Sequence, residues 1–207
     1  MKQNIKFSLL IAAVTALILS CAAATAAPKI GEMAPEFMLS DTFGNDVSSA
    51  DLIGKTVVLE WTNHGCPYVK KHYNSQNMQA LQKEATADDV VWISVISSAE
   101  GKQGSVSAEE ANELTTTRDA SPSHVLLDLE GTMGRAYDAR TTPHMFVIDP
   151  EGKLTFMGGI DDKPTADSAD IEGANNYVRT ALAEMKEGKV VSTPTSRPYG
   201  CSVKYKS

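Results

Sequence analysis

The chain has 207 residues, of which 42% are hydrophobic, and carries 19 Lys and Arg against 26 Asp and Glu, for a net charge of −7 at pH 7. An acidic surface of this kind argues against nucleic acid or an anionic membrane as the main partner, because both repel negative charge. The length suffices for one compact domain with a complete core.

The N-terminal segment, residues 1–26, has the pattern of a secretory signal peptide. Lys2 and Lys6 precede an apolar run over residues 7–20, which is too short for a membrane span, and small residues stand just before Ala27. We therefore expect cleavage before Ala27 and export to the periplasm. Loss of the two lysines gives the mature chain a net charge of −9.

Cys21 leaves an alternative route of export open. Residues 18–21, Ile-Leu-Ser-Cys, partly resemble a bacterial lipoprotein box, in which Cys21 would be lipidated and would anchor the protein to a membrane. Leu19 is an unusual residue in such a box, so we favour simple secretion. On either route the chain leaves the cytoplasm for an envelope in which disulfides persist.

The mature chain divides into a domain over residues 27–190 and a tail over 191–207, and the domain alternates strands with helices. Apolar periodicity and turn residues predict strands at 36–40, 55–61, 90–96, 124–129, 145–149 and 154–157. They predict helices at 66–85, from 107 onward, at 131–138 and at 171–185. Parallel strands joined by helices, with an antiparallel pair near the end, make an α/β domain: a central mixed sheet with helices on both faces.

Local signals support these elements. The continuous apolar run at 57–59 is typical of a central strand covered on both faces. Ser107 and Glu110 have the spacing of a capping box, residues 149–152 have the composition of a hairpin turn, and Gly188 stands where a helix would end. Within the helix predicted at 66–85, one face is expected to hold Val69, Tyr73, Ala80 and Leu81.

Cys66 is the main candidate for chemistry. It follows a Val-rich strand and stands at the start of a predicted helix, with Pro67 in the first helical turn. Unpaired N–H groups and the helix dipole at this position favour the thiolate, which is the reactive form. Side chains at such turns commonly reach solvent, so we expect an exposed, reactive thiol rather than a buried, inert one.

The order of elements, the Cys at the strand-to-helix turn and Thr142-Pro143 before a late strand resemble the thioredoxin-like fold. Residues 141–162 are similar to the redoxin or thiol-specific antioxidant branch, which includes alkyl hydroperoxide reductase-like proteins. Residues 197–205, Arg-Pro-Tyr-Gly-Cys-Ser-Val-Lys-Tyr, resemble the C-terminus of secreted members with Asn-His-Gly-Cys-Pro at the active site. The resemblance implies a thiol-disulfide oxidoreductase acting on protein or small-molecule thiols and disulfides.

The resemblance also implies roles for individual residues. Cys66 matches the nucleophilic cysteine, Pro143 the cis-proline beside it, and the backbone of Thr142 the edge that pairs with an extended substrate. Glu60 falls where thioredoxins place a buried acid that moves a proton, and burial would raise its pKa. Three residues flanking the sulfur are further candidates for substrate binding: Trp61, His64 and Pro67. A cationic His64 would lower the pKa of the thiol, and Trp61 would otherwise be a core residue.

The sequence departs from the family patterns at several positions. The second cysteine of a thioredoxin motif is replaced by Val69, so a local dithiol is absent. Peroxiredoxins have a Thr three residues before the peroxidatic Cys and a Pro seven before, and these positions are Asn63 and Leu59 here. The peroxiredoxin Arg falls on Pro143. These differences favour disulfide exchange over peroxide reduction.

Cys201 is the remaining thiol available to resolve a mixed disulfide on Cys66. A redox couple, a permanent structural disulfide and a free Cys201 are all compatible with the sequence. Two other functions stay open: a thiol peroxidase that reacts with hydroperoxide, and a non-catalytic or copper(I)-binding module using His64 and both cysteines. The sequence contains no phosphate loop, zinc motif or Ser-His-Asp arrangement, and we predict no metal and no cofactor.

Overall fold

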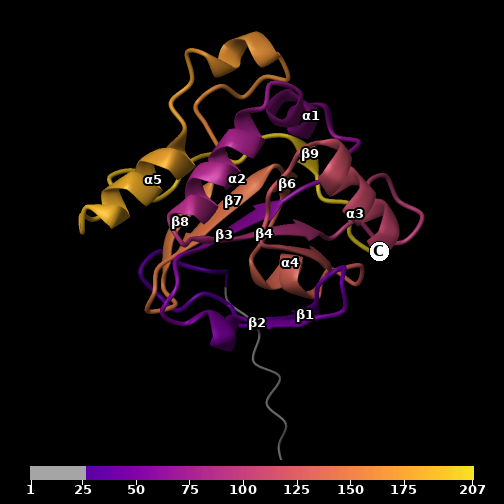
Figure 1. Cartoon of the computed structure of the whole chain (residues 1–207), viewed down its shortest axis with the longest axis horizontal. Coiled ribbons are helices and arrows are strands. Elements are labelled where there is room, and N and C mark those ends of the chain that lie inside the picture. The colour runs from indigo at the N-terminus through magenta and orange to yellow at the C-terminus, as the bar shows by residue number, and fades with distance from the viewer. Residues whose placement is uncertain (1–26) are drawn as a thin grey trace, which may run out of the picture.

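The structure, a computed structural model, describes residues 27–207 (Figure 1). The predicted signal peptide and Cys21 lie outside these residues. Within residues 27–207, no helix has both the length and the apolar composition needed to cross a membrane. The strands are β1 (Met38–Ser40), β2 (Asp46–Ser48), β3 (Val57–Trp61), β4 (Val91–Ile96), β5 (His124–Leu127), β6 (Thr141–Thr142), β7 (His144–Ile148), β8 (Leu154–Gly158) and β9 (Cys201–Ser202). The α-helices are α1 (Pro67–Asn74), α2 (Asn77–Ala87), α3 (Ala108–Thr117), α4 (Thr132–Ala136) and α5 (Tyr177–Lys186), with 3-10 helices η1 (Ser49–Leu52) and η2 (Ser168–Ile171).

The main sheet has five strands in the order β5-β4-β3-β7-β8. Strands β3, β4 and β5 are parallel, whereas β7 runs antiparallel to both β3 and β8. The predicted central mixed sheet is confirmed. Two small antiparallel pairs, β1-β2 and β6-β9, lie outside it.

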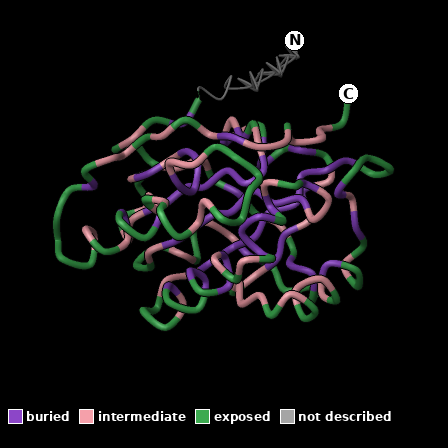
Figure 2. The backbone as a smooth tube through the Cα atoms, turned by 90° about the horizontal axis from the view of Figure 1, so that it is seen from above, coloured by how far each residue is buried: buried purple, intermediate pink, exposed green. Residues whose placement is uncertain are grey.

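Both faces of the sheet are covered. Helices α1, α2 and α5 pack on one face, and α4 with the β1-β2 hairpin packs on the other (Figure 1). The buried residues form clusters on the two sides of the sheet. Figure 2 shows buried stretches of the backbone in the middle of the molecule and exposed ones around its edge. All five residues of β3 are buried, as the apolar run at 57–59 predicted for a doubly covered central strand.

The prediction of a single helix over 66–85 is wrong. The chain forms α1 and α2, separated at Gln76, which adopts the left-handed conformation with φ of 61°. The hydroxyl of Ser75 donates to the carbonyl of Lys71 and helps to end α1. The break rotates the second helix, so that Met78 is buried and Ala80, predicted on the core face, is exposed.

The last helix is shorter than the predicted 171–185. Ile171 ends the 3-10 helix η2, and α5 begins only after Asn176, whose side chain accepts from the backbone N–H of Arg179. The predicted stop is confirmed: Gly188 follows α5 with φ of 70°. The capping box at Ser107 and the hairpin at 149–152 are also confirmed, whereas β2 was not predicted.

Candidate active site

Cys66 is the N-cap of α1, at the end of the turn that leaves β3. Asn63 shapes this turn. Its Oδ1 accepts from the backbone N–H of Gly65 at 2.8 Å, and its Nδ2 donates to the carbonyl of Gln103 at 3.1 Å. The Cys66 N–H donates to the Asn63 carbonyl at 3.0 Å. Sequence reasoning missed this role, although an Asn two residues before a Gly is an Asx-turn signal.

The expectation of an exposed thiol at Cys66 is wrong. The residue has 0% of its surface exposed. The cover is the C-terminal tail, whose strand β9 pairs antiparallel with β6 so that Cys201 faces Thr142 (Figure 1). Sequence reasoning placed Cys66 correctly on a strand-to-helix turn, but the segment that covers it is remote in sequence.

The Cys66 thiol donates a hydrogen bond to the carbonyl oxygen of Thr142 at 3.1 Å. Burial alone would raise the pKa of this thiol, but donors outweigh it and the pKa of Cys66 lies below its ordinary value. These donors are the thiol and N–H of Cys201, the N–H of Val69 and the hydroxyl of Thr142. Hydrogen bonds to the charged form favour it, so Cys66 ionises more readily than an ordinary thiol.

Cys201 has the opposite tendency. Burial raises the pKa of Cys201 to about 11, together with its hydrogen bond to Cys66 and the negative charge of the Cys66 thiolate. Among the described residues, both are free thiols, and Cys201 packs against the core cluster that contains Cys66. The structure therefore brings together the two cysteines that the sequence singled out and distinguishes them: the pKa of Cys66 is lowered and that of Cys201 is raised, so Cys66 is the thiol that ionises first.

Pro143 follows a cis peptide bond, as the resemblance implied. Thr142, just before it, directs its carbonyl toward the sulfur of Cys66 and its strand edge toward β9. The predicted juxtaposition of Cys66, Thr142 and Pro143 is therefore present, with the tail at the edge where an extended substrate was expected.

Glu60 is fully buried in β3, and its carboxylate accepts hydrogen bonds from four side chains. The donors are the Tyr73 hydroxyl, the Gln82 amide, the Trp92 indole and the Ser94 hydroxyl. Burial raises the pKa of Glu60 even though these donors oppose the shift. The environment is the one expected for a buried acid.

His64 does not supply the predicted positive charge. Burial and the charges of Arg118 and Lys70 lower its pKa below the ordinary value of 6.5, so the imidazole is neutral at neutral pH. Within residues 27–207, no group of three or more His, Cys, Asp or Glu side chains is arranged to hold a metal ion. The structure therefore does not assemble the copper ligands considered from the sequence, which combined His64 with Cys66 and Cys201.

Trp61 and Pro67 lie at the two ends of the turn between β3 and α1, and their environments differ. Trp61 has no exposed surface; its indole packs against Phe146 and Tyr137 in the cluster on the other face of the sheet from Cys66. Burial leaves it no surface to offer a substrate, and it acts as a core residue. Pro67 is exposed at the first position of α1.

A buried polar cluster near the site was not predicted. Asp161 accepts from the hydroxyl of Tyr199, and its second oxygen lies 3.8 Å from Lys71 Nζ and 3.9 Å from His72 Nε2. His72 has 0% of its surface exposed, although it belongs to a helix at the surface of the domain. Only the tertiary structure brings these residues, from α1, the segment after β8 and the tail, into contact.

The fold and the Cys66 site define a thioredoxin-like redoxin. Residues 30–157 match the model of the AhpC/TSA family, and the chain belongs to this family. A curated relative, the thiol-disulfide oxidoreductase ResA of Bacillus subtilis strain 168, is 28% identical over 124 residues, which cover 60% of this chain and 64% of the relative. The chain thus spans less than two thirds of that relative.

Two solved structures share the fold over nearly the whole domain. An uncharacterised conserved protein from Geobacillus kaustophilus has a TM-score of 0.73 at 24% identity, covering 86% of this chain and 93% of its own. A hypothetical protein from Sinorhizobium meliloti 1021 also has a TM-score of 0.73, at 20% identity, covering 88% and 97%. At these identities the likeness concerns the fold alone.

Proposed function

We propose that this protein is an exported thiol-disulfide oxidoreductase in which Cys66 is the nucleophile and Cys201 resolves the mixed disulfide. One observation carries the proposal: two free thiols with opposite pKa shifts meet beside Thr142. The named activity of the ResA relative and membership of the AhpC/TSA family support it. The signal-peptide pattern before Ala27 supports export.

The exchange runs in two steps. The Cys66 thiolate attacks one sulfur of a substrate disulfide, the substrate S–S bond breaks, and the released substrate thiolate takes a proton. Cys201, once deprotonated, attacks Cys66 and forms the Cys66–Cys201 disulfide, and the second substrate thiolate leaves and is protonated. Two electrons pass to the substrate, and a dithiol donor returns the protein to its reduced form. The reverse sequence oxidises a substrate dithiol.

The raised pKa of Cys201 makes a proton acceptor necessary in the second step. Glu60, whose pKa is raised by burial, is the buried acid available for this proton, in the role that thioredoxin-like proteins give to the equivalent residue. Thr142 and Pro143 present the backbone edge at which an extended substrate pairs. Pro67 is exposed at the first turn of α1, next to Cys66 in the chain.

Mass spectrometry of peptides containing Cys66 tests the proposal. Reduced wild-type protein mixed with a peptide disulfide should yield the Cys66–Cys201 disulfide and an equal amount of peptide dithiol. Cys201→Ser should accumulate a mixed disulfide on Cys66, and Cys66→Ser should do neither. Failure of Cys201→Ser to trap the peptide would reject the resolving role.

A parallel assay distinguishes the peroxidase alternative. Rapid consumption of hydroperoxide by the wild type, with no exchange on the peptide disulfide, would overturn the proposal. Export is tested separately on the protein purified from its native cell: an N-terminus at Ala27 supports secretion, and a lipid on Cys21 identifies an anchored form.

A further inference from the structure

Residues 194–206, here called the C-terminal strap, cross the active site and are fixed on both sides of it. Before the site, the carbonyl of Pro194 accepts from Met157 in β8 at 3.0 Å. After the site, the N–H of Val203 donates to the Arg140 carbonyl at 3.0 Å, and the Tyr205 hydroxyl donates to a carbonyl next to α4. The strap is therefore a packed part of the fold, held over Cys66 by contacts at both ends.

The centre of the strap occupies the edge of β6. Cys201 pairs with Thr142 and Ser202 with Thr141, antiparallel, which is the position that an extended substrate would take beside Cys66. Gly200 makes this approach possible: its φ is 130°, and a Cβ at this position would collide with the carbonyl oxygen of Thr142. The strap therefore lies on the backbone of the substrate edge with no space between them.

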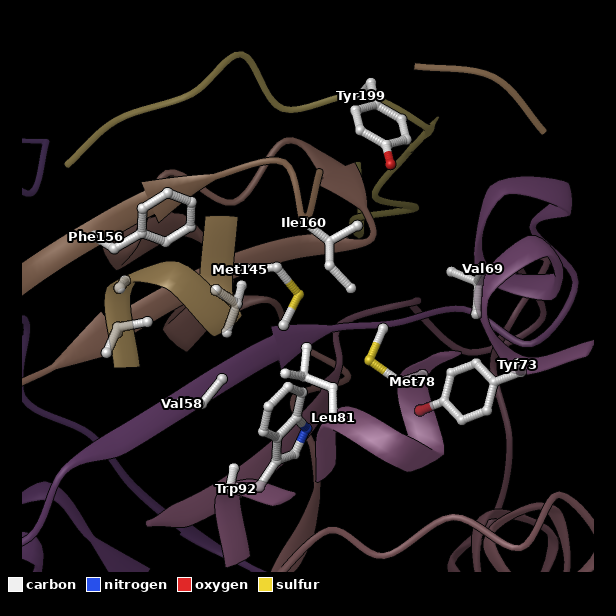
Figure 3. Close-up of a cluster of buried hydrophobic side chains, with 14 of the residues drawn as sticks. Val58, Val69, Tyr73, Met78, Leu81, Trp92, Met145, Phe156, Ile160 and Tyr199 are labelled. Atoms are coloured by element: carbon white, nitrogen blue, oxygen red, sulfur yellow. The ribbon is translucent and has the colours of Figure 1, made fainter. Parts of the chain in front are cut away.

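A buried latch holds the strap in place. The hydroxyl of Tyr199 donates to Oδ1 of Asp161, and the Tyr199 ring packs edge-on against Tyr68 of α1. Figure 3 shows Tyr199 on the strap, above the core cluster on this face of the sheet. The side chains of Asp161, Lys71 and His72 beneath it are at most 1% exposed.

One oxygen of the latch carboxylate is incompletely partnered. Within the described residues, Oδ2 of Asp161 has no hydrogen-bond partner, although Lys71 Nζ lies 3.8 Å away. Buried charges with incomplete partners lose solvation energy that they regain when water reaches them. Departure of Tyr199 would break its hydrogen bonds to Asp161 and His72 but would admit water to Asp161 and Lys71, so the open state recovers part of the cost.

From these contacts we propose that the C-terminal strap is an internal occupant of the substrate edge, latched by Tyr199 on Asp161, and that its release controls access to Cys66. The proposal rests on the proposed function, because it assigns the strap to the same thiol. A substrate pairs with Thr142 only after β9 leaves, and return of the strap brings Cys201 to the mixed disulfide. Closure thus shields the thiolate between turnovers and delivers the resolving thiol.

The test is the rate at which N-ethylmaleimide alkylates Cys66 in the reduced, full-length protein, measured on the Cys66 peptide by mass spectrometry. Gly200→Ala displaces the strap by collision, and Tyr199→Phe removes the latch hydroxyl while keeping the ring. Gly173→Ala is the matched control, since a Cβ at this position meets nothing within 4 Å. We expect slow alkylation in the wild type and the control. Tyr199→Phe should react about tenfold faster, the factor that loss of the hydrogen bond to the Asp161 carboxylate gives. Gly200→Ala should react at least as fast as Tyr199→Phe.

Hydrogen exchange confirms that each variant is folded: amides of β3 should stay protected while those of β9 lose protection. Equal Cys66 rates in the wild type and folded Gly200→Ala would overturn the strap, and a wild-type rate in Tyr199→Phe would overturn the latch. Because alkylation needs no turnover, the two proposals fail separately. Strap-dependent alkylation without disulfide exchange would support the strap and reject the oxidoreductase.

Discussion

The thiol of Cys66 donates a hydrogen bond to the carbonyl oxygen of Thr142 at 3.1 Å, across 76 residues of sequence. The same Thr142 pairs through its strand edge with Cys201. Thr142, the residue before the cis-proline, thus contacts both cysteines. The ionisation of Cys66 depends in part on hydrogen-bond donors that the tail provides. The site is assembled from β3, β6 and the C-terminus together.

The first prediction concerns the hydrogen bond from Cys201 to the Cys66 thiolate. Cys201→Ala removes this donor and should raise the pKa of Cys66 by about one unit, since one unit corresponds to about 1.4 kcal/mol. Cys201→Ser keeps a hydroxyl donor and should raise it less. The ultraviolet absorbance of the thiolate as a function of pH measures both. If the pKa of Cys66 in Cys201→Ala equals that in the wild type, the thiol of Cys201 does not stabilise the Cys66 thiolate.

The second prediction concerns Val69, which stands where a thioredoxin has its second cysteine. Val69 is fully buried in the first turn of α1, and its N–H donates to the sulfur of Cys66. In a Cys201→Ser background, Val69→Cys should form a disulfide between the introduced thiol and Cys66 on oxidation, and should restore exchange. Val69→Ala in the same background is the control and should stay inactive. Absence of the new disulfide from the peptide map would mean that the turn holds position 69 away from the sulfur.

The third prediction concerns Glu60. Glu60→Ala leaves four buried donors without an acceptor and should lower the free energy of unfolding by about 3–5 kcal/mol. Glu60→Gln keeps the shape: its amide oxygen can replace Oε2 as the acceptor for Gln82, Trp92 and Ser94, and its NH2 can donate to the oxygen of Tyr73, so it should cost only about 1 kcal/mol. If Glu60 accepts the proton of Cys201, Glu60→Gln slows resolution of the mixed disulfide and alters its pH dependence. An unaltered rate and pH profile would leave Glu60 with a structural role only.

The fourth prediction concerns stability at acid pH. Burial and the charge of Lys71 lower the pKa of His72 to about 3, and burial lowers that of His144 to about 4. The unfolded state binds protons at these residues near pH 6.5 and the folded state does not, so stability is lost as the pH falls below about 6.5. Between pH 7 and pH 5, each histidine should lower the free energy of unfolding by about 2 kcal/mol.

Denaturant titrations of the wild type and His72→Gln at both pH values measure this loss. The raised pKa of Glu60 has the opposite sign, because its contribution grows on acidification, but it is common to both proteins and cancels in the comparison. The variant should lose about 2 kcal/mol less than the wild type. Equal losses would show that His72 is protonated in the folded protein.

Several strands and helices were predictable because their sequence signals are local. The apolar run at 57–59, the turn at 149–152 and the capping box at Ser107 each act within a few residues of the chain, and each element appears where expected. The break at Gln76 was not predictable from apolar spacing, since the hydrophobic period continues through it. Only the φ of 61° shows that the chain turns.

The sequence by itself determined the order of the main strands and helices and the position of Cys66 at the start of a helix, because strand and helix patterns carry that information. The resemblance to the thioredoxin-like fold implied that Thr142 and Pro143 lie beside Cys66. Tertiary structure alone decided that Cys66 is buried and that Tyr199, Asp161, Lys71 and His72 form one cluster. Burial depends on which distant segment covers a residue, and a tail with little periodicity gives no local sign of where it will pack.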